Sequence, residues 1–288
     1  MRFDLFCSWC IFFAVALSVD NVKSQIGPNV TFDGPFLNLR YEPVTVDVVT
    51  KDTKKCPPST PITFEGYYGA PTFLINTGVS IQTNDQRRTA AKSYGGPLKG
   101  VYNYLSFQYY WASNTSAGVT GTTIDKKSFP YVVRDFYINS KYTNFTEAIK
   151  HEDGFVDYVF LFTICSRFNK AFEKVSQAIR KIPKAGSFTY VPFGVHIDGI
   201  HFLSPKTDYY TYTGNFFDKY TGKNYPCLTV VIFKPNSGFC ITQEQFDQTF
   251  NIQTNFFGKP FANSLTHDSS KMRPALCRAG VTQTLLPI

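Results

Sequence analysis

The chain has 288 residues, 43% of them hydrophobic, and it carries a formal net charge of +8. This length is enough to bury one substantial core, and no change in composition marks a second domain. Aromatic residues are abundant, with 29 Phe and 18 Tyr against 2 Trp and 2 Met. Aromatic side chains pack well on pleated surfaces, so this composition favours a sheet and argues against a helical bundle.

Residues 1–24 have the pattern of a cleaved signal peptide. A basic residue precedes an apolar run from Leu5 to Val19, and the small residues Ala16 and Ser18 lie near its end. A membrane anchor is the alternative, but a spanning helix needs about 20 apolar residues and this run is shorter. We therefore expect cleavage between about residues 18 and 24, no transmembrane anchor, and a secreted, extracellular protein.

The next segment, residues 25–55, is rich in Pro, Asn, Asp and Lys, and it predicts an N-terminal arm lying on the domain, with 44–49 as a short edge strand. Beyond it, β-branched and aromatic segments alternate with turn residues. The strands predicted in this way are 72–76, 101–111, 131–138, 155–164 and 228–233. The pattern indicates one mainly β (α+β) domain over residues 56–288, centred on a sheet with peripheral helices.

One segment predicts a helix. Asn169 is a suitable N-cap, and apolar residues from Phe172 to Ile182 follow at spacings of three and four. Pro183 then ends the helix, because proline cannot continue the backbone hydrogen bonding.

The cysteines suggest disulfides in an oxidising compartment. The signal peptide takes two of the seven, which leaves Cys56, Cys165, Cys227, Cys240 and Cys277. An odd number leaves at least one outside an intramolecular disulfide. We expect this to be Cys165, because it ends an apolar run and should behave there as a small buried hydrophobe.

Surface features point to glycosylation and to anionic partners. Acceptor sequons begin at Asn29, Asn114 and Asn144. A basic secreted protein attracts anions such as sulfated glycans, phospholipid surfaces or acidic matrix proteins, although the charge also serves solubility alone. The candidate anion-binding residues are the dense basic groups Arg87, Arg88, Lys92, Arg180, Lys181 and Lys184. We expect no nucleic-acid partner.

Several short motifs resemble the α-carbonic anhydrases. Gly95–Leu98 followed by Phe107–Trp111 is similar to that family's pattern G-G-P-L…F-H-F-H-W. Other stretches keep the family's order, namely Asn76–Gly78, Ile124–Lys127, Asn139–Tyr142, Asp208–Gly214 and Met272–Pro274. The resemblance runs from about Cys56 to Cys277. It implies a large twisted, mostly antiparallel sheet with a metal site in a conical pocket on one face.

The positions that the resemblance assigns to zinc ligands have lost their histidines. Catalysis in that family needs three neutral imidazoles around Zn²⁺, which lowers the pKa of a bound water to about 7. The first two positions, two residues apart and so on one face of a strand, are Gln108 and Tyr110. A gap-free alignment puts the third, on the neighbouring strand, at Tyr137. An amide is a poor zinc ligand and a phenol has a pKa of about 10, so we expect no zinc and no other cofactor.

Other functional positions implied by the resemblance also differ. Val79 stands for the proton-shuttle histidine, Phe217 for the gatekeeper threonine, and Gly121 for the residue that accepts the threonine's proton. Ser106 and Val132 stand for partners that orient the ligands. The remaining pocket should be smaller and aromatic, either plugged for packing or remodelled for a new ligand.

Few histidines remain that could form a relocated metal site. His196 and His201 with Asp198 offer suitable ligand chemistry, but they lie in a glycine-containing segment where loop residues are expected. His151, beside two acidic residues, is typical of a turn.

The resemblance further implies a disulfide between Cys56 and Cys227, and Cys240 with Cys277 is a second proposed pair. The best-supported function is a secreted, catalytically inactive carbonic anhydrase-like binding module for an anionic glycan or matrix protein. The alternatives are an active zinc enzyme that hydrates CO₂ with an unusual ligand set, and a structural protein of the extracellular matrix.

Overall fold

The structure is a computed structural model that describes residues 41–43, 46–56, 60–66, 72–78, 80–84, 91–112, 119–191, 208–218, 221–232, 239–249, 275–277 and 281–284. All of these lie in one compact unit, Gly34–Ile288. The predicted signal peptide lies outside the described residues. Within them, no helix is both long enough and apolar enough to cross a membrane.

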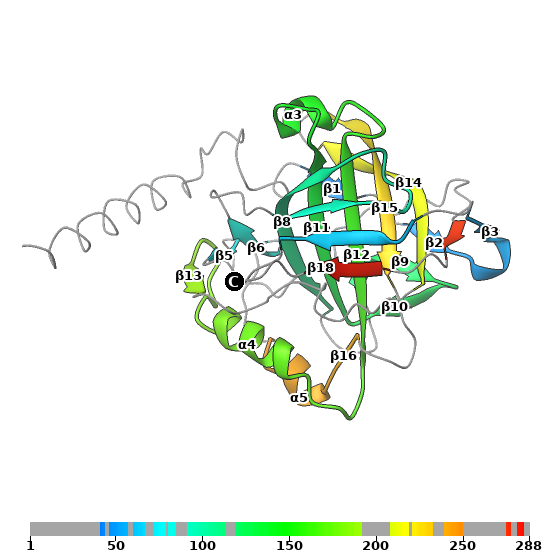
Figure 1. Ribbon diagram of the computed structural model, residues 1–288. Helices are drawn as coiled ribbons and strands as arrows, with labels where there is room; N and C mark the ends of the chain where they lie inside the picture. The colour runs from blue at the N-terminus through cyan, green and yellow to red at the C-terminus, as the bar shows by residue number, and fades with distance from the viewer. Residues whose placement is uncertain are drawn as a thin grey trace, which may run out of the picture. The chain divides into compact units, whose positions relative to one another are not determined.

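Strands dominate the described part of the chain, as the composition predicts (Figure 1). They are β1 (Tyr41–Pro43), β2 (Val46–Val48), β3 (Lys54–Lys55), β4 (Ile62–Glu65), β5 (Thr72–Asn76), β6 (Ile81–Asn84), β7 (Lys92–Tyr94), β8 (Tyr102–Trp111), β9 (Val119–Ile124), β10 (Lys127–Phe129), β11 (Tyr131–Asn139), β12 (Phe155–Ile164), β13 (Phe188–Val191), β14 (Tyr209–Asp218), β15 (Lys223–Ile232), β16 (Cys240–Ile241), β17 (Ala275–Cys277) and β18 (Val281–Thr284). The helices are the 3₁₀ turn η1 (Thr50–Asp52), α3 (Phe145–Ala148), α4 (Lys170–Ile179) and α5 (Gln243–Asp247).

One large sheet has the order β13-β5-β6-β8-β11-β12-β15-β14-β17-β3. Its central pairs β8–β11 and β11–β12 are antiparallel, whereas β12 and β15 run parallel. The predicted strands 72–76 and 155–164 are confirmed as β5 and β12, and 228–233 proves to be the end of the longer β15. A separate sheet of the order β10-β9-β2 holds the predicted edge strand of the N-terminal arm as β2.

Two aspartates tie this arm to the β9–β10 hairpin. Asp47 accepts hydrogen bonds from the Thr123 hydroxyl at 2.7 Å and from the Lys126 N–H at 2.8 Å. Asp125 accepts from the N–H and the hydroxyl of Thr50 at 2.8 and 2.6 Å. These bonds hold β2 in register beside β9.

The predicted helix is α4, and its cap is the expected one. The Asn169 side chain accepts a hydrogen bond from the Phe172 N–H at 3.0 Å, which satisfies one of the free donors at the helix start. Phe172, Val175 and Ile179 are buried and pack against one face of the sheet, where the Phe172 ring lies 4.9 Å from that of Tyr131. In Figure 1, α4 and α5 lie together below the sheet.

The other face of the sheet carries two smaller apolar clusters. One surrounds Val132 and Leu161, and the other surrounds Phe136 and Phe155. Within β12, residues 156, 158, 160 and 162 belong to the helix-side core, whereas 155, 159 and 161 belong to the opposite face. This alternation, which follows from the two-residue period of a strand, decides which side chains can meet.

A β-bulge interrupts β8. Phe136 lies opposite Ser106 but Tyr137 lies opposite Tyr104, so Leu105 is an extra residue on β8. The bulge shifts the alternation along β8, and Tyr104 therefore joins the same core as Phe107.

Candidate functional site

Polar side chains line up across β8, β11 and β12 on the face away from the helices. Gln108 lies opposite Arg134, which lies opposite Val159 in the next strand. The adjacent row joins Ser106, Phe136 and Asp157 in the same way. Side chains of directly opposed residues point to the same face and lie about 5 Å apart at Cβ. Gln108 and Arg134 are therefore neighbours in the middle of this face.

Arg134 forms a buried ion pair with Asp157. Both side chains are almost fully buried, at 2% and 1% exposure. Nη1 of Arg134 donates to the Asp157 carboxylate, and Nη2 donates to the Thr122 hydroxyl at 3.3 Å. An unpaired charge in such a place would cost several kcal/mol, so each member of the pair depends on the other.

Burial also changes the acidity of groups around this pair. It raises the pKa of the Asp157 carboxyl from its ordinary value to about 6, while the Arg134 charge and its hydrogen bond act in the opposite direction. Burial likewise raises the pKa of the Tyr212 hydroxyl, again against the influence of Arg134. Tyr212 therefore stays a neutral phenol at any physiological pH.

Gln108 and Tyr110 bond to each other. The Tyr110 hydroxyl donates to Oε1 of Gln108, which is only 1% exposed. Within the described residues, three buried polar atoms near Arg134 make no hydrogen bond: Nε2 of Gln108, Oγ of Ser106 and Oδ1 of Asp157. Buried polar atoms ordinarily form hydrogen bonds with protein or ordered water. The buried surroundings of Arg134 therefore contain more polar atoms than the side chains there can satisfy.

Tyr137 does not join Gln108 and Tyr110. It points to the helix-side core, where its ring packs edge-on against Tyr104 at 5.6 Å and Tyr158 at 5.3 Å. The prediction that Tyr137 holds the third ligand-equivalent position is therefore wrong. The residue of β11 that faces Gln108 is Arg134. The two-residue period of a strand could have identified Arg134. Val132 was already assigned a position beside the ligands, and Arg134, two positions later, lies on the same face of the strand.

These side chains do not fit a zinc ion. A guanidinium has no lone pair to donate and stays charged at all relevant pH values, while an amide and a phenol replace the other two imidazoles. No group of three or more His, Cys, Asp or Glu in the described ranges could hold a metal ion. The alternative cluster of His196, His201 and Asp198 lies outside those ranges, as does Val79.

The remaining predicted positions are distributed along the same strands. Gly121 lies in β9, and Phe217 lies in β14 opposite Asn224 of β15. Ser106 and Val132 both lie on the face of Gln108. His151 follows α3 in a turn, as expected, where it stacks on Tyr142 with ring centroids 4.5 Å apart.

The cysteine pairing differs from the predictions. Cys165 and Cys240 form a disulfide with a Cα–Cα distance of 5.7 Å, so the prediction that Cys165 stays outside a disulfide is wrong, and so is the Cys240–Cys277 pair. The cause is the pairing of β16 with the end of β12, which brings the two residues together. Cys227 is a buried thiol, which contradicts the predicted Cys56–Cys227 pair, although Cys56 itself is disulfide-bonded.

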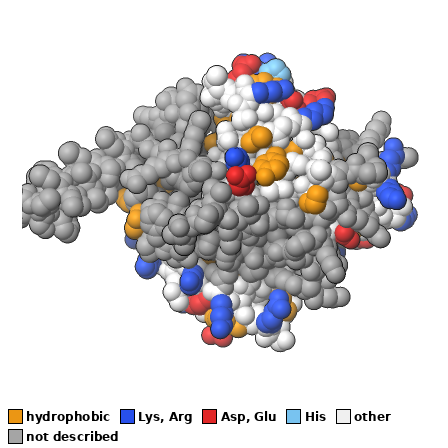
Figure 2. All heavy atoms as spheres, in the orientation of Figure 1, with side chains coloured by type: hydrophobic (Ala, Val, Ile, Leu, Met, Phe, Trp, Pro, Cys, Tyr) orange, Lys and Arg blue, Asp and Glu red, His pale blue; other side chains and the backbone are white. Residues whose placement is uncertain are grey.

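The six basic candidates differ in their surroundings. Lys92 lies 3.4 Å from the Glu65 carboxylate, and Arg180 lies 3.4 Å from Glu173, so both are engaged in ion pairs. Lys181 and Lys184 are exposed beside α4, while Arg87 and Arg88 lie outside the described residues. Figure 2 shows Lys and Arg side chains along the lower part of the molecule, where α4 lies in Figure 1.

Sequence reasoning missed two further basic residues, Lys170 and Lys174. Both are exposed on α4, and with the predicted Lys181 just beyond the helix they follow spacings of four and seven, which place all three on one side. The helical period that predicted the buried face of α4 could also have identified this exposed one.

Comparison with known proteins places these features in a family. Residues 43–255 match the family model of the eukaryotic-type carbonic anhydrases. The chain is 30% identical over 172 residues to carbonic anhydrase 3 of Sus scrofa, and 28% identical over the same length to carbonic anhydrase 3 of Mus musculus and of Rattus norvegicus. Each alignment covers 59% of this chain and 64% of the relative, just under two thirds of the relative's length.

Proposed function

Because the chain belongs to the eukaryotic-type carbonic anhydrase family, we propose that it is a secreted member that does not hydrate CO₂ and acts instead as an extracellular binding protein. The proposal that the chain does not hydrate CO₂ is supported above all by Arg134 on β11, which lies opposite Gln108 and is bonded to Asp157. This side chain puts a permanent positive charge where the family's chemistry needs a neutral ligand.

Electrostatics argues strongly against a metal ion at this place. A +2 ion about 4 Å from a guanidinium would be repelled by roughly 8 kcal/mol at an effective dielectric constant of about 20. Asp157 could offset part of this, but its carboxylate is already engaged by Arg134. No step of metal-dependent catalysis can therefore be assigned to these residues.

The proposed binding surface is the exposed side of α4 together with the residues that directly follow the helix. It consists of Lys170, Lys174, Lys181 and Lys184, which have no ion-pair partner among the described residues. Glu173 is the acidic residue within α4, and it is engaged by Arg180 and by Gln177 at 3.2 Å. The adjoining α5 contributes exposed Glu244 and Asp247, so the basic charge is concentrated on the α4 side.

A sulfated glycan fits this surface better than a compact ligand. Lys170 and Lys174 lie about 6 Å apart along the axis of α4, since each residue rises 1.5 Å, and Lys181 and Lys184 follow just beyond its end. A linear polyanion can contact all four. Such contacts add up through long-range attraction and weaken with salt.

A CO₂ hydration assay on the protein purified from culture medium tests the catalytic part of the proposal. The expected rate equals that of buffer alone at all zinc concentrations. Zinc-dependent hydration in proportion to protein would overturn it.

A further inference from the structure

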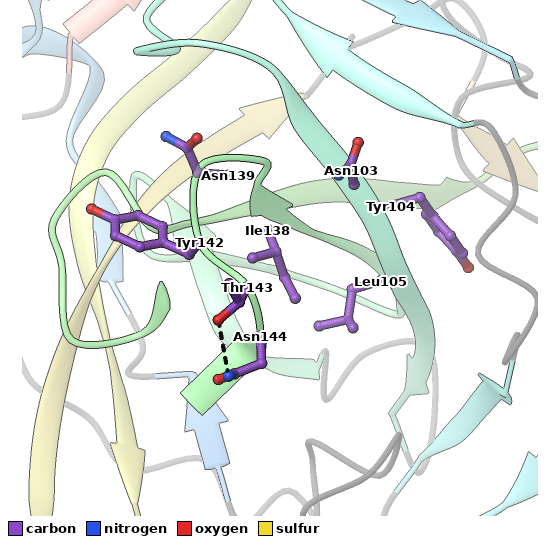
Figure 3. A pocket seen from close by; sticks show the side chains of 8 residues that line it. All are labelled: Asn103, Tyr104, Leu105, Ile138, Asn139, Tyr142, Thr143 and Asn144. Carbon is purple, nitrogen blue, oxygen red and sulfur yellow. Dashed lines mark hydrogen bonds between the residues drawn. The ribbon is translucent and has the colours of Figure 1, made fainter. Parts of the chain in front are cut away.

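A small pocket opens beside α3, where the bulged part of β8 meets the end of β11 (Figure 3). Its aliphatic wall is formed by Leu105 and Ile138, and polar groups of Asn103, Thr143 and Asn144 surround it. Its enclosed space is about 20 Å³, which is roughly the room that one water molecule or one methyl group needs. The pocket therefore cannot enclose a ring, but it can take one small group of a ligand that lies over its mouth.

Tyr142 forms another wall of the pocket, and its neighbours hold its side chain in place. Its hydroxyl donates to Oδ1 of Asp153 at 2.8 Å, and its ring stacks on His151. Asp153 also engages Lys141 and, through its carbonyl, Asn139 at 2.9 Å. A preorganised wall loses little conformational entropy when a ligand packs on it.

The amide of Asn144 is held in one orientation at the edge of the pocket. Its Oδ1 caps α3 by accepting a hydrogen bond from the Glu147 N–H at 2.9 Å. Its Nδ2 donates to the Thr143 hydroxyl at 3.2 Å, as the dashed line in Figure 3 shows. Because these two hydrogen bonds fix the amide, a group bonded to Nδ2 would extend in a fixed direction. Asn144 is exposed and lines the pocket, so such a group would lie beside the pocket.

Asn144 also begins the sequon Asn144-Phe145-Thr146. We propose that Asn144 carries an N-linked glycan and that the first N-acetylglucosamine of this glycan lies over the mouth of the pocket, with only its acetamido methyl group inside, on Leu105 and Ile138. This inference rests on the proposed secretion, because the modification takes place in the secretory pathway.

The bond-forming step is balanced by a lipid-linked donor. Nδ2 of Asn144 attacks C1 of the first sugar of an oligosaccharide carried on a lipid pyrophosphate. The Nδ2–C1 bond forms, the bond from C1 to the phosphate oxygen breaks, and the proton lost from Nδ2 leaves with the lipid pyrophosphate. Nδ2 keeps one N–H, which can still donate to Thr143, and the cap made by Oδ1 is untouched.

Two variants separate the sugar from the cap. Thr146→Ala removes the sequon but leaves the Asn144 cap in place, and Thr146→Ser keeps both. Protein from a eukaryotic secretory host should yield a glycopeptide at Asn144 in the wild type and in Thr146→Ser, and none in Thr146→Ala. The Tm of Thr146→Ala should fall by roughly 2–4 °C, and enzymatic trimming of the wild type to one N-acetylglucosamine should leave its Tm unchanged.

The pocket contact is tested by Leu105→Ala in both backgrounds. The substitution should lower Tm more in the glycosylated wild type than in Thr146→Ala, because only the former loses a sugar contact. Equal losses overturn the packing of the sugar in the pocket. An unmodified Asn144 in a chain glycosylated at Asn29 or Asn114 overturns the inference while secretion stands. A chain without sugar at any sequon that stays inside the cell overturns the secretion as well.

Discussion

Arg134 on β11 and Asp157 on β12 form an ion pair at the centre of a sheet face that is otherwise divided between two apolar clusters. The pair lies diagonally across neighbouring strands, since Asp157 is opposite Phe136 and Arg134 is opposite Val159. The face is therefore organised around a charge that belongs to the protein itself.

Breaking this pair from one side should be costly. Arg134→Leu leaves a buried carboxylate without its partner and should lower the free energy of unfolding by about 3–5 kcal/mol. Arg134→Leu combined with Asp157→Leu should recover most of this loss, because the unpaired charge is gone. Urea unfolding of wild type, Arg134→Leu, Asp157→Leu and the double variant measures the cycle. Lys150→Ala at the exposed Glu147 pair is a control, and it should change stability by less than about 1 kcal/mol. Additive losses in the double variant would contradict the prediction.

The raised pKa of Asp157 predicts a pH dependence of stability with a definite sign. The folded protein holds a proton on this carboxyl up to about pH 6, whereas the unfolded chain releases it near 3.8. Between these values the folded state binds more protons than the unfolded state. The contribution of this group to the free energy of unfolding therefore falls as pH rises, and it becomes constant above about pH 7. The measurement is the free energy of unfolding of wild type at each pH, minus that of Asp157→Asn. This difference cancels the contributions of other titrating groups such as Asp153, whose pKa is lowered mainly by Lys141. A difference that stays flat from pH 4 to 7 would show that Asp157 does not titrate there.

The disulfide between Cys165 and Cys240 closes a loop with a sequence separation of 75. Loop-closure entropy predicts that Cys165→Ala with Cys240→Ala loses about 4 kcal/mol of stability. Chemical unfolding measures this, and wild type under reducing conditions should show a loss of the same size or larger. An unchanged midpoint in the double variant would mean that the bond does not form.

Peptide mapping should also show how Cys56 is paired. The parallel register sets Lys54 opposite Ala275 and Lys55 opposite Leu276, so Cys56 and Cys277 are the next pair along the two strands. We expect non-reducing digests to contain a peptide that joins Cys56 to Cys277. A peptide that joins either residue to Cys227 would contradict both the register and the buried thiol.

Charge reversal tests the binding surface on α4. Lys170→Glu, Lys174→Glu and Lys181→Glu together should lower the salt concentration at which the protein elutes from immobilised heparin. Lys51→Glu, Lys54→Glu and Lys126→Glu change the net charge equally at exposed residues elsewhere, and they should lower it much less. The same elution for both triple variants would mean that heparin senses only the total charge of the protein.

How far the sequence alone leads differs between the elements and the site. The strands β5 and β12 and the helix α4 could be predicted because their β-branched, aromatic and capping residues act locally. The face of a β11 side chain could not be taken from hydrophobicity, because all nine residues from Tyr131 to Asn139 are buried. Because both faces of this strand are buried, its sequence does not alternate between apolar and polar residues. The hydrophobic pattern therefore could not reveal that the alignment had placed Tyr137 on the wrong face.

The disulfide connectivity shows a second limit. Cys165 looked like a core residue because it follows the apolar strand β12, and its partner lies 75 positions away. Only the pairing of Thr163 with Cys240, a contact between distant segments, brings the two sulfurs together. Such long-range pairing depends on the whole sheet and leaves no local signal.

The zinc content of the purified chain tests the central claim most directly. Wild type exchanged into buffer containing zinc and then freed of excess metal should retain far less than one zinc per chain by elemental analysis. A matched variant with Gln108→His, Tyr110→His and Arg134→His, together with Asp157→Val so that no carboxylate stays unpaired, should retain about one. One zinc per chain in the wild type, lost when Gln108 and Tyr110 are replaced by alanine, would contradict the account.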